Sequence, residues 1–155
     1  MADSVTAGCI ALGCDHGGFE LKQQIIKYLE AEGVTYRDFG CTDTKSCDYP
    51  DYGQAAAAAV AQGECSMGIV ICTTGIGISI TANKIKGIRC ALCGDVVSAR
   101  LTREHNDANM LALGAGITGT YLALGIVDTF LHTKFSGLEK HCRRISKIAA
   151  LEEEK

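Results

Sequence analysis

The chain alternates short apolar runs with longer stretches of helical periodicity, and this alternation is its strongest constraint on fold. Each apolar run has the length of a buried strand, and hydrophobic residues then recur every three or four positions. The sequence predicts strands at residues 9–13, 35–39, 67–71, 88–92 and 110–114. It predicts helices at residues 18–32, 52–62, 76–84, 95–103, 118–132 and 139–152.

Strands that alternate with helices indicate a parallel sheet covered on both faces. We therefore expect a three-layer α/β/α protein with a five-stranded parallel sheet, of the Rossmann or flavodoxin-like class. If the strand order is the flavodoxin-like 2-1-3-4-5, ligands bind at the switch point between the first and third strands. The 155 residues are expected to form one domain, with an N-terminal tail at 1–7 and a C-terminal helix at 139–155.

Composition narrows the classes of partner and compartment. A net charge of −3 gives no support for nucleic acid or an anionic membrane as a partner. No apolar run reaches the roughly 18–20 residues of a membrane span. The first residues lack the basic start and apolar core of a secretory leader, so we expect a cytoplasmic protein.

The nine cysteines need an interpretation of their own. Because the number is odd and several lie in apolar runs, most are interpreted as free thiols that act as small hydrophobes. Cys90 and Cys93 have C-x-x-C spacing, but they lie in a predicted strand region and no second pair follows at zinc-site distance. We therefore expect no metal site.

The third predicted strand leads into a thiol and a glycine-rich turn. The turn follows Cys72 and consists of Thr73, Thr74, Gly75, Ile76 and Gly77. Its glycines leave backbone N–H groups free to approach an anion at the start of the next helix. A tyrosine-phosphatase loop is excluded, because the arginine of its C-x₅-R pattern is replaced by Ile78. The segment indicates a thiol base or nucleophile beside an anion site.

Two further polar clusters follow predicted elements. Asp15 and His16 end the first strand among glycines, and they are either a turn with a surface histidine or a pair that binds sugar hydroxyls. His105, Asn106 and Asp107 follow the fourth predicted helix. A histidine in a loop is often only solvated, but the adjacent amide and carboxylate can orient it for acid–base work.

Two more segments can be explained by structure alone, without a functional role. Tyr49 lies in Asp-Tyr-Pro-Asp-Tyr, which would normally be a turn leading into a helix. Lys140, Arg143 and Arg144 would normally form a solvated basic face. In an acidic chain, however, this basic run is also the obvious counter-charge for a phosphate.

Taken together, these segments resemble the type B ribose-5-phosphate isomerases, in the wider family that includes allose- and galactose-6-phosphate isomerases. The resemblance rests on motifs in a single order through nearly the whole chain. These are Gly-Cys-Asp-His (13–16), Asp-Tyr-Pro (48–50), Ile-Cys-Thr-Thr-Gly-Ile-Gly-Ile-Ser (71–79), Ala-Asn-Lys (82–84), Gly-Ile-Arg (87–89), Arg-Glu-His-Asn-Asp (103–107) and Leu-Ala-Leu-Gly (111–114).

The resemblance implies the interconversion of ribose 5-phosphate and ribulose 5-phosphate through a cis-enediolate, with no metal or organic cofactor. Cys72 matches the family's proton-shuttling cysteine, and Thr74 with backbone N–H groups matches the stabiliser of the enediolate oxygen. His105 matches the acid that opens the sugar ring, with Asp15 assisting.

The same resemblance assigns the remaining candidates. The substrate-binding positions are His16, Tyr49, Thr73, Gly75, Ile76, Gly77 and Asn106, and the phosphate ligands align with Lys140 and with Arg143 or Arg144. Family sites lie at a dimer interface, so the resemblance implies a homodimer or a dimer of dimers. His105 and Asn106 would then serve the Cys72 of the neighbouring subunit.

The chain departs from the family pattern at two places. Gly116 stands where the family usually has an arginine after the fifth strand, and the C-terminal basic motif is one residue longer. A six-carbon sugar phosphate is therefore an alternative substrate. A non-catalytic sugar-phosphate sensor and a thiol-rich metal-binding protein are the competing classes of function.

Overall fold

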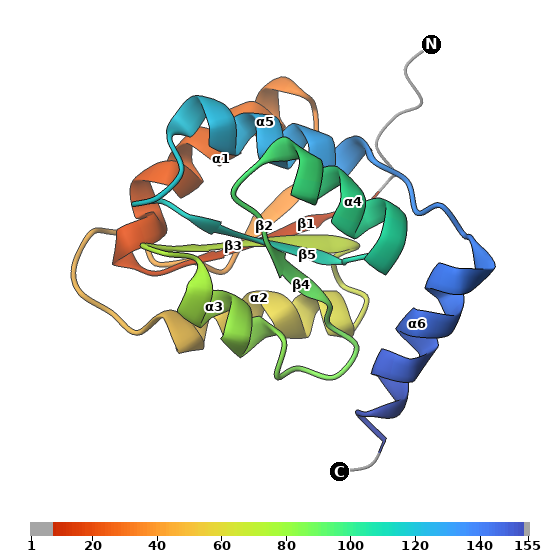
Figure 1. Cartoon of the computed structure of the whole chain (residues 1–155). Helices are drawn as coiled ribbons and strands as arrows, with labels where there is room; N and C mark the ends of the chain where they lie inside the picture. Colours follow the sequence, from red (N-terminus) through yellow and green to blue (C-terminus); the bar gives the residue numbers. More distant parts are fainter. Residues whose placement is uncertain (1–7, 154–155) are drawn as a thin grey trace.

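The computed structural model describes residues 8–153, and the predicted tail at 1–7 lies outside the described residues. Figure 1 shows a sheet with helices on both faces and the C-terminal helix to one side. The strands are β1 (Ile10–Cys14), β2 (Tyr36–Asp38), β3 (Met67–Cys72), β4 (Cys90–Leu92) and β5 (Met110–Gly114). The helices are η1 (His16–Gly18), α1 (Phe19–Ala31), α2 (Tyr49–Ala61), α3 (Ile76–Ala82), α4 (Val96–Asn106), α5 (Thr120–His132) and α6 (Glu139–Ala150). The predicted strands and helices are thus confirmed, with small shifts at their ends.

Within the described residues the sheet has five strands in the order β2-β1-β3-β5-β4, and neighbouring strands are parallel. The expected three-layer α/β class is confirmed. The order 2-1-3-4-5 is wrong at one edge, because β5 lies between β3 and β4. β5 is buried along its whole length and suits the interior, whereas β4 is short and partly exposed and suits an edge. The switch point between β1 and β3 is unaffected.

Alternate residues of the central strands face two separate apolar layers. Larger side chains face α1 and α5, and they include Leu12, Ile69, Ile71, Leu111 and Leu113. Smaller side chains face α2 and α3, and they include Ala11, Val70 and Ala112. Because these residues are small, the alanine-rich helix α2 packs closely against the sheet and against α3. This packing fixes the position of α2 next to the switch point.

Helix α2 begins earlier than predicted. The sequence predicts a loop up to Asp51 and a helix from Tyr52, whereas α2 starts at Tyr49. Pro50 lies in the first turn, where a residue without an N–H loses no helical hydrogen bond. Tyr49 therefore stands in the first turn of a helix rather than in a loop.

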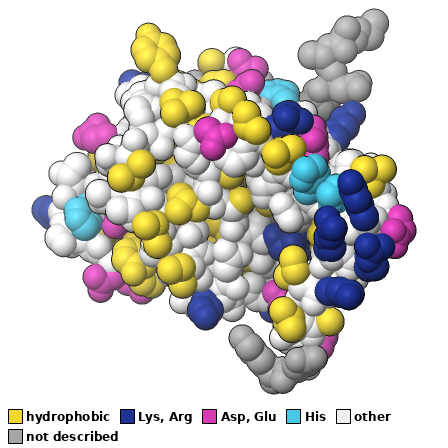
Figure 2. Space-filling view, viewed as in Figure 1, with side chains coloured by type: hydrophobic (Ala, Val, Ile, Leu, Met, Phe, Trp, Pro, Cys, Tyr) yellow, Lys and Arg dark blue, Asp and Glu magenta, His cyan; other side chains and the backbone are white. Residues whose placement is uncertain are grey.

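Helix α6 lies outside the three-layer body, beside α4 (Figure 1). It follows α5 through residues 133–138, where Gly137 has a φ of +67°. Figure 2 shows Lys and Arg side chains gathered over this helix. None of the helices in residues 8–153 has the length and apolar character that crossing a membrane requires.

Candidate active site

A cleft of about 480 Å³ lies at the carboxyl ends of β1 and β3. It is lined by Asp15, Tyr49, Cys72, Thr73, Thr74, Ile76, Gly77 and Ile80. The two strands are neighbours in the sheet, with Cys14 beside Ile71, so their following loops meet at this edge. The predicted switch point between the first and third strands is thus the place where the Asp15 loop and the Cys72 loop meet.

Cys72 is the last residue of β3 and is only 4% exposed. The Gly75 N–H donates a hydrogen bond to its Sγ at 3.1 Å. This bond requires the chain to turn back on itself, and Gly75 does so with a φ of +75°. An anionic sulfur is a stronger acceptor than a neutral thiol, so the turn is suited to a thiolate.

The other buried cysteines have a different environment. Burial raises the pKa of Cys14 and of Cys65 to about 12, so both thiols stay protonated at neutral pH. Cys14, Cys41 and Cys93 are part of the apolar core. Their role as small hydrophobes is confirmed.

The loop after Cys72 is held between neighbouring backbones. A side chain at Gly114 would place its Cβ 2.5 Å from the carbonyl oxygen of Thr74. Thr74 Oγ1 accepts the Ile76 N–H at 3.2 Å, and the Gly116 N–H donates to the Thr73 carbonyl at 2.8 Å. These contacts fix the two threonines at the mouth of the cleft.

Asp15 caps its own turn and also lines the cleft. One carboxylate oxygen accepts the Gly18 N–H at 3.2 Å, and the side chain is nearly buried. The second carboxylate oxygen lies 4.0 Å from Nδ1 of His16. The turn interpretation and the functional interpretation of Asp15 are therefore compatible.

His16 is oriented by a contact that the sequence does not suggest. The backbone N–H of Cys47 donates to its Nδ1 at 3.2 Å. Since Nδ1 is the acceptor, the proton of the neutral ring is on Nε2, and His16 offers an N–H donor on its other side. Cys47 lies in the irregular segment before α2, where no periodic pattern could have indicated this pairing.

Tyr49 closes the cleft from the side of α2. A Cβ at Gly77 would lie 2.5 Å from the Tyr49 ring, so the ring packs directly on the start of α3. The side chain is partly exposed and is one of the cleft's lining residues. Its contact with substrate stays a prediction.

His105 and Asn106 lie at the opposite end of the sheet. The sequence predicts a loop there, but both residues form the last turn of α4, which runs from the carboxyl end of β4 back to the amino end of β5. Eleven residues of helix span about 16 Å, so this turn is far from the cleft of its own chain. The structure does not bring His105 and Cys72 together within one chain.

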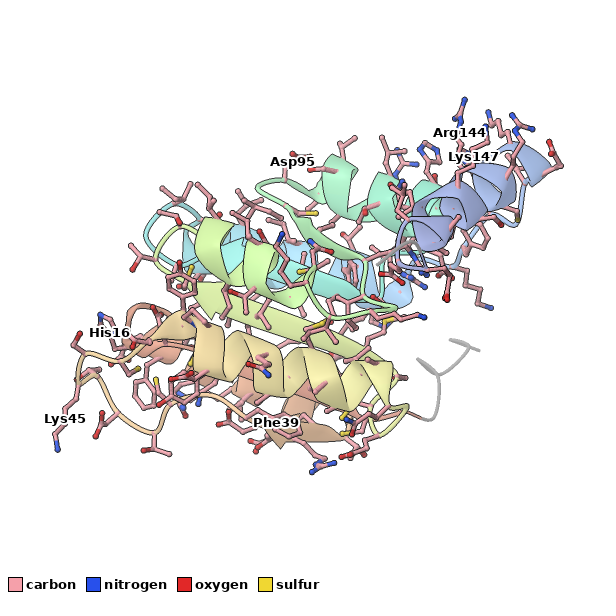
Figure 3. The ribbon with its side chains drawn as sticks, turned by 90° about the horizontal axis from the view of Figure 1, so that it is seen from below. His16, Phe39, Lys45, Asp95, Arg144 and Lys147 are labelled. Atoms are coloured by element: carbon pink, nitrogen blue, oxygen red, sulfur yellow. The ribbon has the colours of Figure 1, made fainter. Side chains whose placement is uncertain are left out.

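The basic residues of α6 accompany His105 rather than Cys72. Figure 3 shows His16 at one end of the molecule and Arg144 at the other. Arg143 pairs with Glu139 of the same helix at 2.8 Å. Lys140 and Arg144 are exposed.

His141 joins α6 to α4. Its ring stacks on the ring of His105, with centroids 4.3 Å apart and planes 14° from parallel. Burial, together with the nearby His105, Lys140 and Arg144, lowers the pKa of His141 from its ordinary value. The Nε2 atom of His141 is buried and has no hydrogen-bond partner within residues 8–153.

Residues 8–153 contain no group of three or more His, Cys, Asp or Glu side chains placed to hold a metal ion. Cys90 is half-buried and Cys93 is buried at the edge of the sheet. The thiol of Cys90 has its pKa raised to about 12 by burial.

Fold and site together define an α/β protein with a cleft at the switch point of a parallel sheet, where a buried thiol lies beside a glycine-rich loop. The family model of the Ribose/Galactose Isomerases matches residues 10–148. The chain belongs to this family.

Individual relatives agree with this assignment. The ribose-5-phosphate isomerase B of Escherichia coli is 46% identical over 144 residues, which cover 93% of this chain and 96% of the relative. The galactose-6-phosphate isomerase subunit LacB of Clostridium acetobutylicum is 43% identical, over 92% of this chain and 82% of the relative. The solved ribose-5-phosphate isomerase B of Clostridium thermocellum has a TM-score of 0.92 and 51% identity, over 94% of this chain and 98% of that chain. The solved type B ribose 5-phosphate isomerase of Trypanosoma brucei has a TM-score of 0.91 and 41% identity, over 94% of this chain and 99% of that chain.

Proposed function

We propose that this chain is an aldose–ketose isomerase that interconverts D-ribose 5-phosphate and D-ribulose 5-phosphate, a step of the non-oxidative pentose phosphate pathway. The observation that carries the proposal is Cys72, a thiol that receives the Gly75 N–H in a cleft it shares with Asp15. Membership of the Ribose/Galactose Isomerase family and the names of the relatives support the same reaction.

The reaction needs proton transfers that these residues can perform. His105 gives a proton to the ring oxygen while Asp15 assists by accepting the proton of the C1 hydroxyl, so that the furanose opens to the free aldehyde. The Cys72 thiolate then removes the proton from C2, and the resulting thiol returns it to C1 of the cis-enediolate. The hydroxyl proton of O2 passes to O1, so the aldehyde becomes a ketone and no atom is gained or lost. Thr74 and the loop N–H groups stabilise the enediolate oxygen. All these groups belong to the protein, and the proposed chemistry uses no cofactor.

The remaining site residues bind the substrate. His16 offers its Nε2–H, and Tyr49 and Asn106 add polar contacts to the sugar. The loop contributes Thr73, Gly75, Ile76 and Gly77, and the phosphate is held by Lys140 together with Arg143 or Arg144. A lysine in place of an arginine gives up a bidentate contact to phosphate, so Lys140 contributes mainly charge.

The proposed site is shared between two copies of the chain. Cys72 and His105 lie at opposite ends of one sheet, so a single chain cannot apply both to one sugar. A homodimer, or a dimer of dimers, brings His105, Asn106 and α6 of one copy to the cleft of the other. Hydrophobic side chains gather over α3 beside the cleft (Figure 2), and Ile76 and Ile80 are 53% and 55% exposed there. Such a surface suits contact with a second copy.

Replacement of Cys72 tests the proposal. Cys72→Ala should abolish exchange of the C2 proton with deuterated solvent, while ribose 5-phosphate binding measured by calorimetry remains. The matched control is Cys142→Ser, which changes an exposed thiol on α6 and should leave turnover unchanged. Unchanged turnover in Cys72→Ala would sink the assignment of the base.

A six-carbon sugar phosphate is the second candidate substrate. Gly116 has no side chain where the family usually has an arginine, and one relative is a galactose-6-phosphate isomerase subunit. The relatives named for ribose 5-phosphate favour the five-carbon substrate. The ratio of kcat/KM for ribose 5-phosphate and allose 6-phosphate decides between them. A single-turnover isomerisation assay separates either enzyme from a non-catalytic binding protein.

We also propose that the chain functions as one domain in the cytoplasm. Its nine cysteines are all free, and a reducing compartment preserves a thiol that acts as a base.

A further inference from the structure

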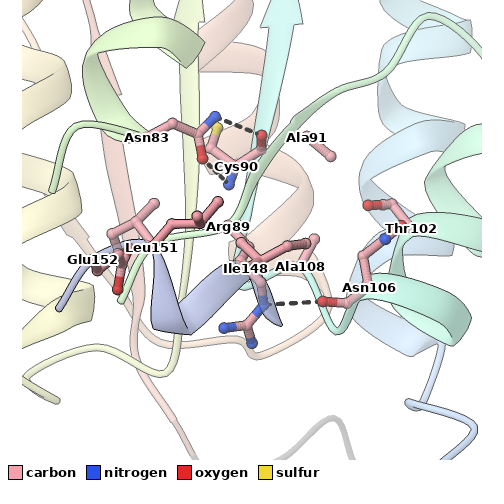
Figure 4. Close-up of a pocket in the computed structure, with 11 residues that line it drawn as sticks. Asn83, Arg89, Cys90, Ala91, Thr102, Asn106, Ala108, Ile148, Leu151 and Glu152 are labelled. Carbon is pink, nitrogen blue, oxygen red and sulfur yellow. Dashed lines mark hydrogen bonds between the residues drawn. The ribbon is translucent and has the colours of Figure 1, made fainter. Parts of the chain in front are cut away.

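Arg89 binds the end of helix α4 from the strand side. Its Nε donates to the carbonyl of Asn106 at 2.9 Å, and its Nη2 donates to the carbonyl of Asp107 at 2.8 Å. The Asp107 carboxylate lies 3.6 Å from the same guanidinium. Figure 4 shows Arg89 reaching across to Asn106. One side chain therefore joins the start of β4 to the last turn of α4.

The backbone of Arg89 is itself fixed. Its N–H donates to Oδ1 of Asn109 at 2.8 Å, and its carbonyl accepts the Asn109 N–H at 3.1 Å. The Asn109 amide also donates to the Gly87 carbonyl at 2.8 Å. Because the chain around Arg89 is held in this way, the guanidinium approaches α4 from a fixed point.

The end of α4 needs such support. The last carbonyls of a helix have no intrahelical partner, and a positive side chain there also complements the helix dipole. Asp107 ends the helix with a φ of +43°, a conformation that a residue other than glycine adopts at some cost. Asn106, whose carbonyl Arg89 holds, directly follows His105.

Two polar side chains of the surrounding groove, those of Asn83 and Glu152, are paired within the fold. The groove has a volume of about 780 Å³ and lies between β4, the end of α4 and α6. The Asn83 amide is paired with the Cys90 backbone at 2.9 and 2.8 Å, and Glu152 accepts the Gly87 N–H. With these groups satisfied, the guanidinium acts within the fold.

We propose that Arg89 is a positioning residue for the isomerisation: it fixes the last turn of α4, so that His105 and Asn106 meet the cleft of the neighbouring subunit in one geometry. This rests on the shared site of the proposed function. Arg89 itself touches no reacting atom.

Kinetics of two variants provide the first measurement. In Arg89→Gln and Arg89→Lys, kcat should fall about 10- to 100-fold, because small displacements of catalytic groups cost that much. KM for ribose 5-phosphate should change less than about threefold, since α6 and the Cys72 loop are intact. Lysine keeps the charge but cannot reach two carbonyls with a planar fork.

Arg100→Gln is the matched control on the same helix. Arg100 is exposed and pairs with the Glu104 carboxylate at 3.1 Å, without contacting the carbonyls of Asn106 and Asp107. Its replacement should leave kcat within about twofold of the wild-type value, because a surface ion pair contributes little. Equal losses in Arg89→Gln and Arg100→Gln would overturn the inference.

Mixed dimers test whether Arg89 acts on the neighbouring site. A heterodimer of Arg89→Gln and Cys72→Ala chains, purified with two different tags, contains one site with an intact Cys72 and a braced His105. It should recover about half of the wild-type activity, since one of its two sites is complete. A heterodimer of His105→Asn and Cys72→Ala is the reference for the shared site.

The two heterodimers separate the outcomes. Recovery in both supports the inference. Recovery only in the His105→Asn reference overturns the role of Arg89 and leaves the shared site standing. No recovery in the reference overturns the shared site itself, whatever the Arg89 heterodimer does.

Discussion

At the residue scale, the backbone beside Cys72 leaves no room for a side chain at Gly114. Its Cβ would lie 2.5 Å from the Thr74 carbonyl oxygen, so Gly114→Ala must push the catalytic loop outward. We expect a destabilisation of about 1–3 kcal/mol and a kcat about 100-fold lower. Thermal unfolding and steady-state kinetics measure the two effects.

Gly119→Ala is the matched control for this prediction. Gly119 precedes α5 with an ordinary φ of −64°, and no atom lies within 4 Å of its Cβ position. Its replacement should cost less than about 1 kcal/mol. Normal kcat in Gly114→Ala would contradict the tight packing around Thr74.

The sequence pattern predicted the part of the candidate site that lies at the carboxyl ends of β1 and β3. Asp15 and Cys72 follow apolar runs directly, so a strand assignment alone places them at one edge of the sheet. The hydrogen bond from Cys47 to His16 and the role of Arg89 were not predictable. Both depend on main-chain atoms of irregular segments, and side-chain periodicity carries no information about those.

At the element scale, a buried lysine ties α1 to the segment after β2. Lys22 is 1% exposed, and its Nζ donates to the Asp38 carboxylate and to the Cys41 carbonyl, both at 2.7 Å. Lys22→Met leaves these acceptors without their cation, and we expect a loss of about 1–3 kcal/mol in the free energy of unfolding. Urea denaturation measures it. Lys27→Met, an exposed change on the same helix, should shift the midpoint little.

The docking of α6 should depend on pH through His141. The pKa of His141 is lowered from its ordinary value of 6.5 by burial and by the charges of His105, Lys140 and Arg144. Below pH 6.5, His141 therefore binds a proton more readily when α6 is undocked than when it is docked. The stability of the docked helix is fully present above pH 6.5 and is lost as the pH falls toward the lower pKa of His141 in the folded protein.

Amide hydrogen exchange of α6 measures this effect. Protection, corrected for the intrinsic pH dependence of exchange, should fall on acidification from about pH 7.5 to 5. His141→Gln should remove that dependence. Protection that stays constant in the wild-type protein would rule out control by His141.

Elements with strong periodicity were predicted well, and their order at the sheet edge was not. The runs that form β3 and β5 are continuous and apolar, which identifies buried parallel strands. Adjacency, however, depends on which strand is buried on both faces after packing. That burial decides whether β4 or β5 lies next to β3, and a linear pattern does not encode it.

At the scale of the whole molecule, activity should follow assembly. Since Cys72 and His105 lie at opposite ends of the sheet, specific activity should fall on dilution in parallel with the dimer fraction measured by analytical ultracentrifugation. A fully active monomer would refute the shared site. Excess ribose 5-phosphate should move the transition to lower protein concentration, because in the proposed shared site the substrate binds across the interface.

The sharing of the site was suggested by family resemblance, not by the residue pattern. Periodicity identified α4 and a histidine near its end, but it gave no distance to Cys72. The direction of α4 relative to the sheet provides that distance. A helix that connects two parallel strands begins at the carboxyl end of the first strand and runs back to the amino end of the next one. His105 is thereby removed from the cleft of its own chain.

The groove beneath α6 offers a binding site for an inhibitor that does not compete with the sugar phosphate. It is lined by Arg89 and Asn106 on one side, and on the other by Ile148 of α6 and by Leu151, which follows the end of that helix. A compound wedged there would loosen His105, the proposed acid for the site of the neighbouring subunit, while the cleft at Cys72 stayed open. Raising the sugar-phosphate concentration would not displace such a compound, and its chemistry need not imitate a phosphate.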